Sequence, residues 1–292
     1  MTNPGTRPDW LTQASFPFAS RFLAIDGHTI HYIDEGPREA PVLLLLHGNP
    51  TWSFLYRHLV PKLADRFRCV ALDLPGFGLS EAAPGYDRLP ASHARVVLRF
   101  VDALALSHFT PMLQDWGGPI GLWVSEQRPE RVERLVVLNT WGWPVNGDPH
   151  FERFSGAMGG AIGGFAIRHF NAFVNLLLPA GTPRRKLDRE AMRAYRAVMS
   201  TPDRRASTHV LPREIVHSGP WLAEIEKGLP RLADKPALIV WGTKDIAFRD
   251  KERRRFEAAL PRHETVIVEG AGHFMQEDAP DEIATALRRW WS

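Results

Sequence analysis

The chain has 292 residues, of which 44% are hydrophobic and 24% are charged. These values suit one large α/β domain, or a core that carries an inserted subdomain. The net charge is only +3, and the basic run at residues 253–255 lies beside Glu252 and Glu257 in a stretch that looks like an exposed helix face. A nucleic-acid-binding protein concentrates its positive charge in a stripe, so we expect no nucleic-acid partner.

Cysteine content and apolar segments bear on the compartment. The single cysteine, Cys69, excludes an internal disulfide and agrees with a reducing environment. Residues 1–13 lack the basic start and apolar stretch of a secretory signal. No charge-free apolar segment reaches the roughly 18–20 residues of a membrane helix. We therefore expect a cytoplasmic protein without a membrane span.

Short apolar runs alternate with amphipathic stretches along the first 140 residues, and the alternation returns near residue 221. This order predicts a mostly parallel sheet with helices on its faces. Eight strands are predicted at residues 21–25, 29–34, 42–46, 67–73, 109–113, 134–138, 237–241 and 264–268. Helices are predicted at residues 53–64, 91–105, 117–126, 221–227, 251–260 and 281–290.

The alternation stops after Thr140, where the chain becomes rich in aromatic residues, Gly and Arg. We predict a helical cap inserted after the sixth strand, so that residues 1–140 and 213–292 form the core and residues 141–212 form the cap. Such an insertion lies over the strand ends, where α/β sheets bind ligands. A predicted helix at residues 155–167 carries Gly156, Gly160 and Gly164, a spacing that lets helices approach closely. That helix either lines a buried pocket or contacts another subunit, so a homo-oligomer stays open.

One strand end has the sequence of a nucleophile elbow, a tight strand-to-helix turn that exposes one side chain. The predicted strand at residues 109–113 is followed by Gln114-Asp115-Trp116-Gly117-Gly118. The usual Gly-x-Ser-x-Gly occurs nowhere in the chain, which disfavours a serine esterase. A carboxylate nucleophile forms an ester with an alkyl group. We therefore predict Asp115 as the nucleophile rather than as a helix N-cap residue.

Two more residues complete a triad in the chain order nucleophile, acid, histidine. His273 follows the last predicted strand on a loop of small residues, and Asp245 follows the seventh strand. Asp245 would accept the ring N–H of His273, fix its tautomer and stabilise the imidazolium. The sixth strand has no acid at its end, but Asp148 lies a few residues further on and remains the alternative triad acid.

The third strand is followed by His47-Gly48-Asn49-Pro50-Thr51-Trp52. Here the backbone N–H groups of Asn49 and Trp116 are predicted to form an oxyanion hole. Their side chains add an amide and an indole, and an indole N–H only donates. Two neutral donors in an apolar pocket favour a departing halide, because its charge develops as the carbon–halogen bond breaks. We predict Asn49 and Trp116 as the halide-binding pair.

These motifs, together with Gly272-His273-Phe274, resemble those of haloalkane dehalogenases. The resemblance covers the core on both sides of the insertion, and Asp-Trp-Gly-Gly together with Asn49 is its most specific part. It implies an α/β-hydrolase fold with an eight-stranded sheet and a helical cap, and it implies no cofactor and no metal. Within the family, the chain resembles the branch with an Asp-His-Asp triad and an Asn–Trp halide pair, not the branch with Glu after the sixth strand.

The function so predicted is hydrolysis of a small halogenated alkane by water to alcohol, halide and a proton, through an ester on Asp115. The substrate pocket should be mostly apolar. Aromatic residues in the cap and beside the triad are its candidate walls, although aromatic side chains also serve as core packing. These candidates are Trp141, Phe151, Phe154, Phe165, Phe170, Phe248 and Phe274.

Other functions compete on the same fold. An epoxide hydrolase uses an aspartyl ester too, but its relatives protonate the alkoxide with two cap tyrosines, and this cap has only Tyr195. A haloacid dehalogenase would carry Arg beside the nucleophile, where this chain has Trp116. A coelenterazine-type luciferase closely resembles dehalogenases. A binding protein without turnover needs no nucleophile, base and acid together.

Overall fold

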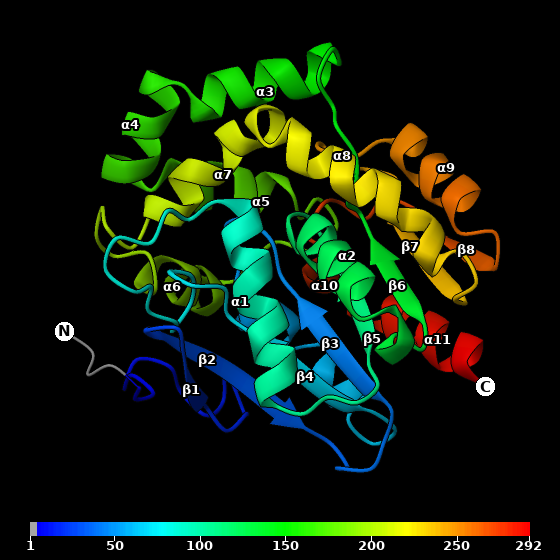
Figure 1. The fold of residues 1–292 in the computed structure, drawn as a ribbon. Helices are drawn as coiled ribbons and strands as arrows, with labels where there is room; N and C mark the ends of the chain where they lie inside the picture. The colour runs from blue at the N-terminus through cyan, green and yellow to red at the C-terminus, as the bar shows by residue number, and fades with distance from the viewer. Residues whose placement is uncertain (1–4) are drawn as a thin grey trace.

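The computed structural model describes residues 5–292; residues 1–4 of the N-terminal stretch expected to lack a secretory signal lie outside the described residues. Eight strands form one sheet in the order β1-β2-β4-β3-β5-β6-β7-β8 (Figure 1). The pairs β1–β2 and β2–β4 are antiparallel, and all other pairs are parallel. The strands are β1 (Arg21–Ile25), β2 (His28–Glu35), β3 (Val42–Leu46), β4 (Arg68–Leu72), β5 (Thr110–Leu113), β6 (Leu135–Leu138), β7 (Ala237–Gly242) and β8 (His263–Val268). The predicted α/β fold with an eight-stranded, mostly parallel sheet is confirmed.

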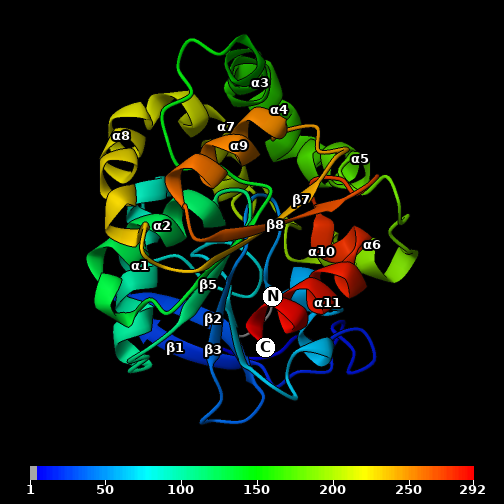
Figure 2. The same cartoon turned by 90° about the vertical axis from the view of Figure 1, so that its right-hand side faces the viewer.

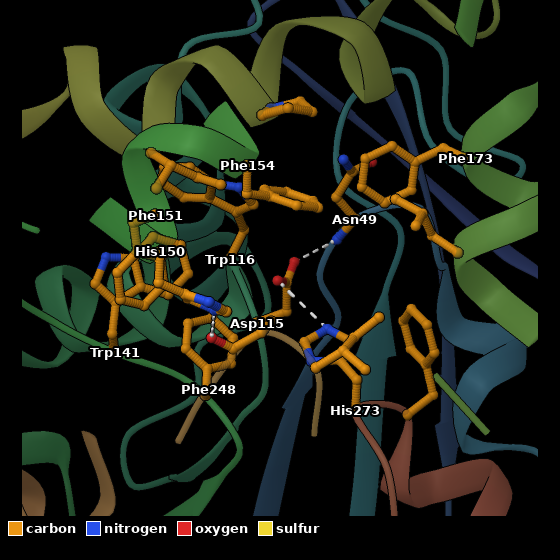
Figure 3. A pocket seen from close by; sticks show the side chains of 16 residues that line it. Asn49, Asp115, Trp116, Trp141, His150, Phe151, Phe154, Phe173, Phe248 and His273 are labelled. Carbon is orange, nitrogen blue, oxygen red and sulfur yellow. Dashed lines mark hydrogen bonds and ion pairs between the residues drawn. The ribbon is translucent and has the colours of Figure 1, made fainter. Parts of the chain in front are cut away.

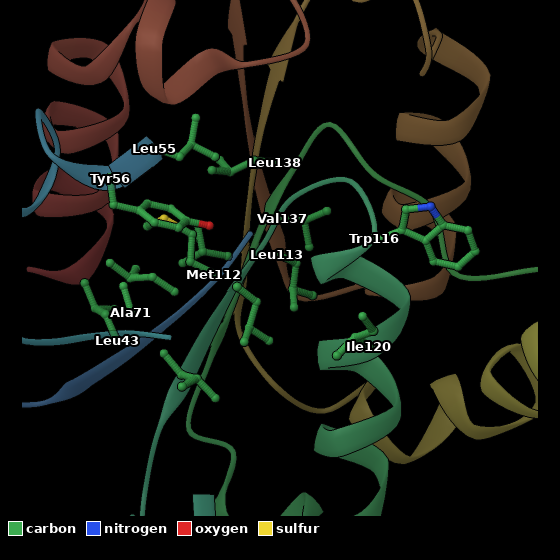
Figure 4. Packing of buried hydrophobic residues seen from close by; sticks show 14 of the residues in the cluster. Leu43, Leu55, Tyr56, Ala71, Met112, Leu113, Trp116, Ile120, Val137 and Leu138 are labelled. Carbon is green, nitrogen blue, oxygen red and sulfur yellow. The ribbon is translucent and has the colours of Figure 1, made fainter. Parts of the chain in front are cut away.

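The central strands are buried on both faces, which explains why they read as unbroken aliphatic runs. In β3, Leu43 to Leu46 are at most 1% exposed. Figure 4 shows side chains from both faces meeting the sheet: Leu55 and Tyr56 pack on one side and Ile120 packs on the other. Burial of these aliphatic side chains fixes the strand ends that carry the polar residues of the site.

Helices cover both faces of the sheet (Figure 2). One face carries α1 (Pro90–Ala103), α2 (Gly117–Gln127), α8 (Gly219–Gly228) and α9 (Asp250–Ala259), and the other carries α11 (Pro280–Trp291). The helix predicted at residues 53–64 is wrong as a continuous helix, because the structure has the 3-10 turns η1 (Ser53–Tyr56) and η2 (Val60–Lys62). Pro61 explains the interruption, since it has no N–H to donate to residue 57 and its ring crowds that carbonyl.

The part of the segment between β6 and β7 that precedes α8 is helical and lies beyond the carboxyl ends of the strands (Figure 1). It contains α3 (Pro149–Gly159), α4 (Ala161–Phe170), the π-helical turn η4 (Phe173–Leu177), α5 (Leu178–Ala180), α6 (Arg189–Ala197) and α7 (Ala206–His217). Residue 212, predicted to end the cap, lies inside α7. Short turns η3 (Pro129–Arg131), η5 (Leu229–Leu232) and α10 (Met275–Asp278) complete the fold.

The single helix predicted at residues 155–167 is wrong. Gly160 has an extended backbone with ψ 177° and separates α3 from α4, so the three spaced glycines do not share one helix face. Across residues 5–292, no single helix is long and apolar enough to cross a membrane. The bent pair Ala161–Phe170 and Phe173–Ala180, at 84° to each other, meets the length and composition only when both parts are taken together.

Candidate active site

Asp115 occupies a strained turn between β5 and α2. Its φ is 48°, a left-handed conformation that costs free energy in a residue other than Gly. The turn is held because the Asp115 N–H donates to the Asn139 carbonyl at 3.1 Å, and Thr140 Oγ1 donates to the Asp115 carbonyl at 2.6 Å. A Cβ on Gly48 would lie 2.2 Å from Asp115 Oδ1. Only glycine therefore lets the loop after β3 approach the carboxylate this closely.

His273 lies between two carboxylates that come from different strand ends. Its Nε2 is 3.5 Å from Asp115 Oδ2, and its Nδ1 is 3.0 Å from Asp245 Oδ2. Figure 3 shows the ring edge of His273 facing the Asp115 carboxylate. The His273 and Asp245 side chains are 7% and 0% exposed, so their interaction is little screened by water. The structure thus brings together the three residues predicted as a triad.

Asp245 is fixed by its own hydrogen bonds. Asn139, the first residue after β6, donates from Nδ2 to Asp245 Oδ2 at 2.7 Å, and the Ala247 N–H donates to Asp245 Oδ1 at 2.6 Å. Asp148, the alternative acid, instead pairs with Arg249 and Lys251 and accepts the His150 N–H at the start of α3. The side-chain amide of Asn139, directly after the sixth strand, therefore orients the carboxylate of Asp245, which follows the seventh strand.

The charges around His273 change its basicity. Burial by itself lowers the pKa of this imidazole, but the carboxylates of Asp245 and Asp115 outweigh burial and raise the pKa of His273 to about 10. The protonated ring is thus favoured while both carboxylates are ionised. Any reaction that removes the charge of Asp115 lowers the pKa of His273 and makes the ring a better proton acceptor.

Gln114 also contacts His273, although sequence reasoning placed it in the elbow motif without a role. Its Nε2 donates to the His273 carbonyl at 3.2 Å and lies 3.1 Å from His273 Nε2. An amide N–H can donate to that ring nitrogen only while Nε2 carries no proton. The sequence signal for this contact was the position of Gln114 directly before Asp115 in the elbow.

Asn49 and Trp116 lie on the other side of the Asp115 carboxylate from His273 (Figure 3). The Asn49 backbone N–H donates to Asp115 Oδ1 at 2.7 Å. This bond occupies Oδ1 and leaves Oδ2, the oxygen near His273, available for reaction. The side chains of Asn49 and Trp116 both line the same cavity as Asp115.

That cavity has a volume of about 180 Å³. An engineered apolar cavity of about 150 Å³ is known to bind benzene, so this space suits a small apolar molecule. Five of the predicted wall residues line it, namely Trp141, Phe151, Phe154, Phe248 and Phe274. The π-stacked pair Trp141 and Phe248, with ring centroids 5.1 Å apart, lies beside the triad.

The prediction that Phe165 and Phe170 line the pocket is wrong, because these side chains are 57% and 67% exposed on α4. The break at Gly160 turns α4 so that they face outward. Sequence reasoning also missed several lining residues, of which Ile246 and Ala247 directly follow Asp245 in the chain. The missed residues are His150, Phe173, Leu177, Pro212, Ile215, Ile246 and Ala247.

Comparison with known proteins agrees with this geometry. A family model described as alpha/beta hydrolase fold matches residues 41–280. Haloalkane dehalogenase 2 of Mycobacterium tuberculosis is 44% identical over 274 residues, which cover 93% of this chain and 94% of that protein. A cis-3-alkyl-4-alkyloxetan-2-one decarboxylase of Xanthomonas campestris is 34% identical over 294 residues, which cover 95% and 97%.

Solved structures give the same picture. Haloalkane dehalogenase DbeA from Bradyrhizobium elkani superposes with a TM-score of 0.83 at 28% identity and covers 94% of this chain and 97% of its own. DatA from Agrobacterium tumefaciens, also a haloalkane dehalogenase, gives 0.84 at 27% identity with 96% and 98% covered. With the elbow aspartate, the histidine and the apolar cavity in place, the chain belongs to the haloalkane dehalogenase family of the α/β-hydrolase fold.

Proposed function

We propose that this enzyme hydrolyses small halogenated alkanes to an alcohol, a halide ion and a proton. One observation carries the proposal: Asp115 is held between a base on one side and two neutral donor side chains on the other, at the wall of an apolar cavity. A nucleophile, a base and a site for a leaving anion are the parts that such a displacement needs.

In the first step, Asp115 Oδ2 attacks the halogen-bearing carbon, because Oδ1 is occupied by the Asn49 N–H. The new C–O bond forms as the carbon–halogen bond breaks, and the halide leaves toward Asn49 Nδ2 and Trp116 Nε1. The product is an alkyl ester on Asp115. These donors act most strongly when the charge has moved to the halogen, so they stabilise the transition state more than the bound substrate.

In the second step, His273 Nε2 removes a proton from a water molecule, and the resulting hydroxide attacks Cγ of the ester. The oxyanion develops on Oδ1, where the backbone N–H groups of Asn49 and Trp116 form the oxyanion hole. Asp245 stabilises the imidazolium through the 3.0 Å contact with Nδ1. Collapse of the intermediate expels the alcohol and restores the carboxylate, and the displaced proton passes to solvent.

Halide release tests the proposal. Wild-type enzyme should release halide from short brominated and chlorinated alkanes, and Asp115→Ala should release none. Asp148→Asn is the matched control, since it also changes a partly buried aspartate but lies outside the cavity. Absence of release by folded wild-type protein across the panel would exclude this function.

The ester itself can be trapped. Because His273 acts only in the second step, His273→Phe should accumulate protein that is heavier by one alkyl group in an intact-mass spectrum. A single turnover of the wild type in ¹⁸O-labelled water should place the label in the Asp115 carboxylate. Label found only in the alcohol would contradict attack of water on the ester.

The decarboxylase relatives supply a second candidate function. An oxetan-2-one is a four-membered cyclic ester, and its decarboxylation releases carbon dioxide and leaves an alkene. Identity of 34% over 95% of the chain favours this candidate. The cavity of about 180 Å³ favours the smaller haloalkane, because the oxetan-2-one in the name of that relative carries two alkyl substituents on its ring. Alkene formation from a dialkyl-oxetanone without halide release from any alkane would select the decarboxylase.

The remaining alternatives are weaker. Tyr195, the one tyrosine of the predicted cap, is buried and donates to Glu277 Oε1 at 2.6 Å. Its proton is therefore directed away from the cavity. Light emission from coelenterazine without halide release would identify a luciferase, and tight ligand binding without turnover would identify a receptor. We further propose a cytoplasmic location, from the cysteine content, and self-association through the exposed apolar side chains of α4.

A further inference from the structure

The side-chain amide of Asn49 is anchored by α7, a helix of the segment inserted between β6 and β7 (the inserted segment). Asn49 Nδ2 donates to the backbone carbonyl of Thr208, on α7, at 3.3 Å. Asn49 is 4% exposed and Thr208 is fully buried, so water does not compete strongly for this bond. The contact joins the loop after β3 to a segment 159 residues further along the chain. It fixes which way the amide faces, since the opposite orientation would set Oδ1 against a carbonyl oxygen.

A carbonyl inside a helix normally accepts the N–H of the residue four positions later. For Thr208 that residue is Pro212, which lies inside α7. Proline has no N–H, and its ring also crowds the carbonyl of the residue four positions earlier and pushes it off the helix axis. The sequence of α7 therefore leaves the Thr208 carbonyl without its helical donor at the point where Asn49 approaches.

We propose that Pro212 is a positioning residue for the halide site. By freeing the Thr208 carbonyl, it orients the amide of Asn49 so that one N–H of Nδ2 is bound to α7 and the other is available to the departing halide. This inference rests on the proposed function, because it assigns a purpose to the halide-binding amide. It makes the halide affinity depend on the position of α7, a helix of the inserted segment, and not only on the core.

Pro212→Ala tests the inference, because Ala restores an N–H at residue 212 that competes for the Thr208 carbonyl. Three changes are expected. The new amide should be protected from hydrogen exchange, the Asn49 side-chain ¹H–¹⁵N signal should shift, and bromide should bind about 2- to 10-fold more weakly, the range of one neutral hydrogen bond. Bromide binding is measured by quenching of tryptophan fluorescence, since Trp116 and Trp141 line the cavity. The thermal midpoint should be unchanged or higher, because proline is unfavourable inside a helix.

Ile215→Ala is the matched control. Ile215 lies on the same helix and lines the same cavity, but its replacement leaves the hydrogen-bond ladder of α7 intact. It should leave the Asn49 signal in place. If Pro212→Ala protects the new amide but leaves both the Asn49 signal and the bromide affinity unchanged, the inference is overturned.

A second variant tests the contact independently of α7. In protein labelled with ¹³C at the threonine carbonyls, Asn49→Ala should shift the Thr208 signal, because that carbonyl loses its donor. An unchanged Thr208 signal would overturn the inference. Both NMR measurements are independent of turnover. A wild type that neither binds nor releases halide would therefore refute the proposed function. The NMR signals of Asn49 and Thr208 would still show whether the Thr208 carbonyl anchors the Asn49 amide.

Discussion

His273 faces Asp115 through Nε2 and Asp245 through Nδ1, and both carboxylates raise the pKa of this ring. While Asp115 is ionised, its charge helps to raise the pKa of His273 to about 10. Ester formation removes that charge, so the pKa of His273 falls when the ring must accept a proton. In the proposed mechanism, Asp115 thus controls the basicity of His273.

The pH dependence of the two steps should therefore differ. Ester formation requires no proton acceptor, so its rate should change little between about pH 6 and about pH 9. Ester hydrolysis requires neutral His273, so its rate should rise with pH and level off below the resting value of about 10, because the ester has already lowered the pKa. Rapid-quench measurement of halide and alcohol separates the steps. A hydrolysis rate that does not depend on pH over this range would refute His273 as the base.

Replacement of the two candidate acids distinguishes their roles. Asp245→Asn should slow ester hydrolysis by about 10³- to 10⁴-fold, because an amide favours the wrong histidine tautomer. Asp148→Asn should leave turnover nearly unchanged, since Asp148 pairs with Arg249 and Lys251. Steady-state alcohol release measures both variants. Comparable activity losses in the two would contradict the assignment of Asp245.

At the scale of secondary-structure elements, the break between α3 and α4 decides which aromatic residues reach the cavity. Phe151 and Phe154 on α3 line it, whereas Phe165 and Phe170 on α4 face outward. Exposed apolar side chains that lie together are typical of contact surfaces. The exposed apolar residues of α4 and the turn that follows are Ile162, Phe165, Phe170 and Leu176.

This surface predicts self-association. The paired substitution Ile162→Ser with Phe165→Ser should lower the apparent mass in gel filtration, because it removes two apolar side chains that are 88% and 57% exposed. Ile267→Thr, at an exposed position of β8, is the control and should have no effect. A wild type that elutes as a monomer at all concentrations would refute the prediction.

Across the whole molecule, a buried charge pair joins the inserted segment to both halves of the core. Arg57, after η1, pairs with Glu277 of α10, and Nη2 lies 2.9 Å from Oε2. Tyr195 of α6 donates to the same carboxylate at 2.6 Å. The Phe274 N–H also donates to the Gly181 carbonyl at 3.1 Å, so the loop that bears His273 is tied to the inserted segment.

Loss of one member of this pair should be costly. Glu277→Gln should lower the free energy of unfolding by about 3–5 kcal/mol, because it leaves the buried Arg57 charge without its partner. The Arg57 and Glu277 side chains are 7% and 1% exposed. Asp65→Asn breaks a surface pair with Arg288 and should change stability far less. Urea denaturation measures both, and equal effects would contradict the argument.

The sequence by itself determined the sheet and the chemistry-bearing strand ends. Each predicted strand agrees with the structure to within one residue at either end. Buried parallel strands are aliphatic throughout and are punctuated by glycine, so local pattern is enough to find them. The same pattern led to Asp115, Asp245 and His273 as candidate site residues, because ligand sites of α/β sheets lie at the carboxyl ends of the strands.

Only the tertiary structure decided which residues of the inserted segment face the cavity and how the donors are oriented. Its helices are short, and their exposed and buried faces depend on packing against the core rather than on periodicity alone. Phe165 and Phe173 look alike in sequence, yet one is 57% exposed and the other lines the cavity. Likewise, the sequence places Pro212 four residues after Thr208, but only the fold shows that Asn49 donates to the Thr208 carbonyl.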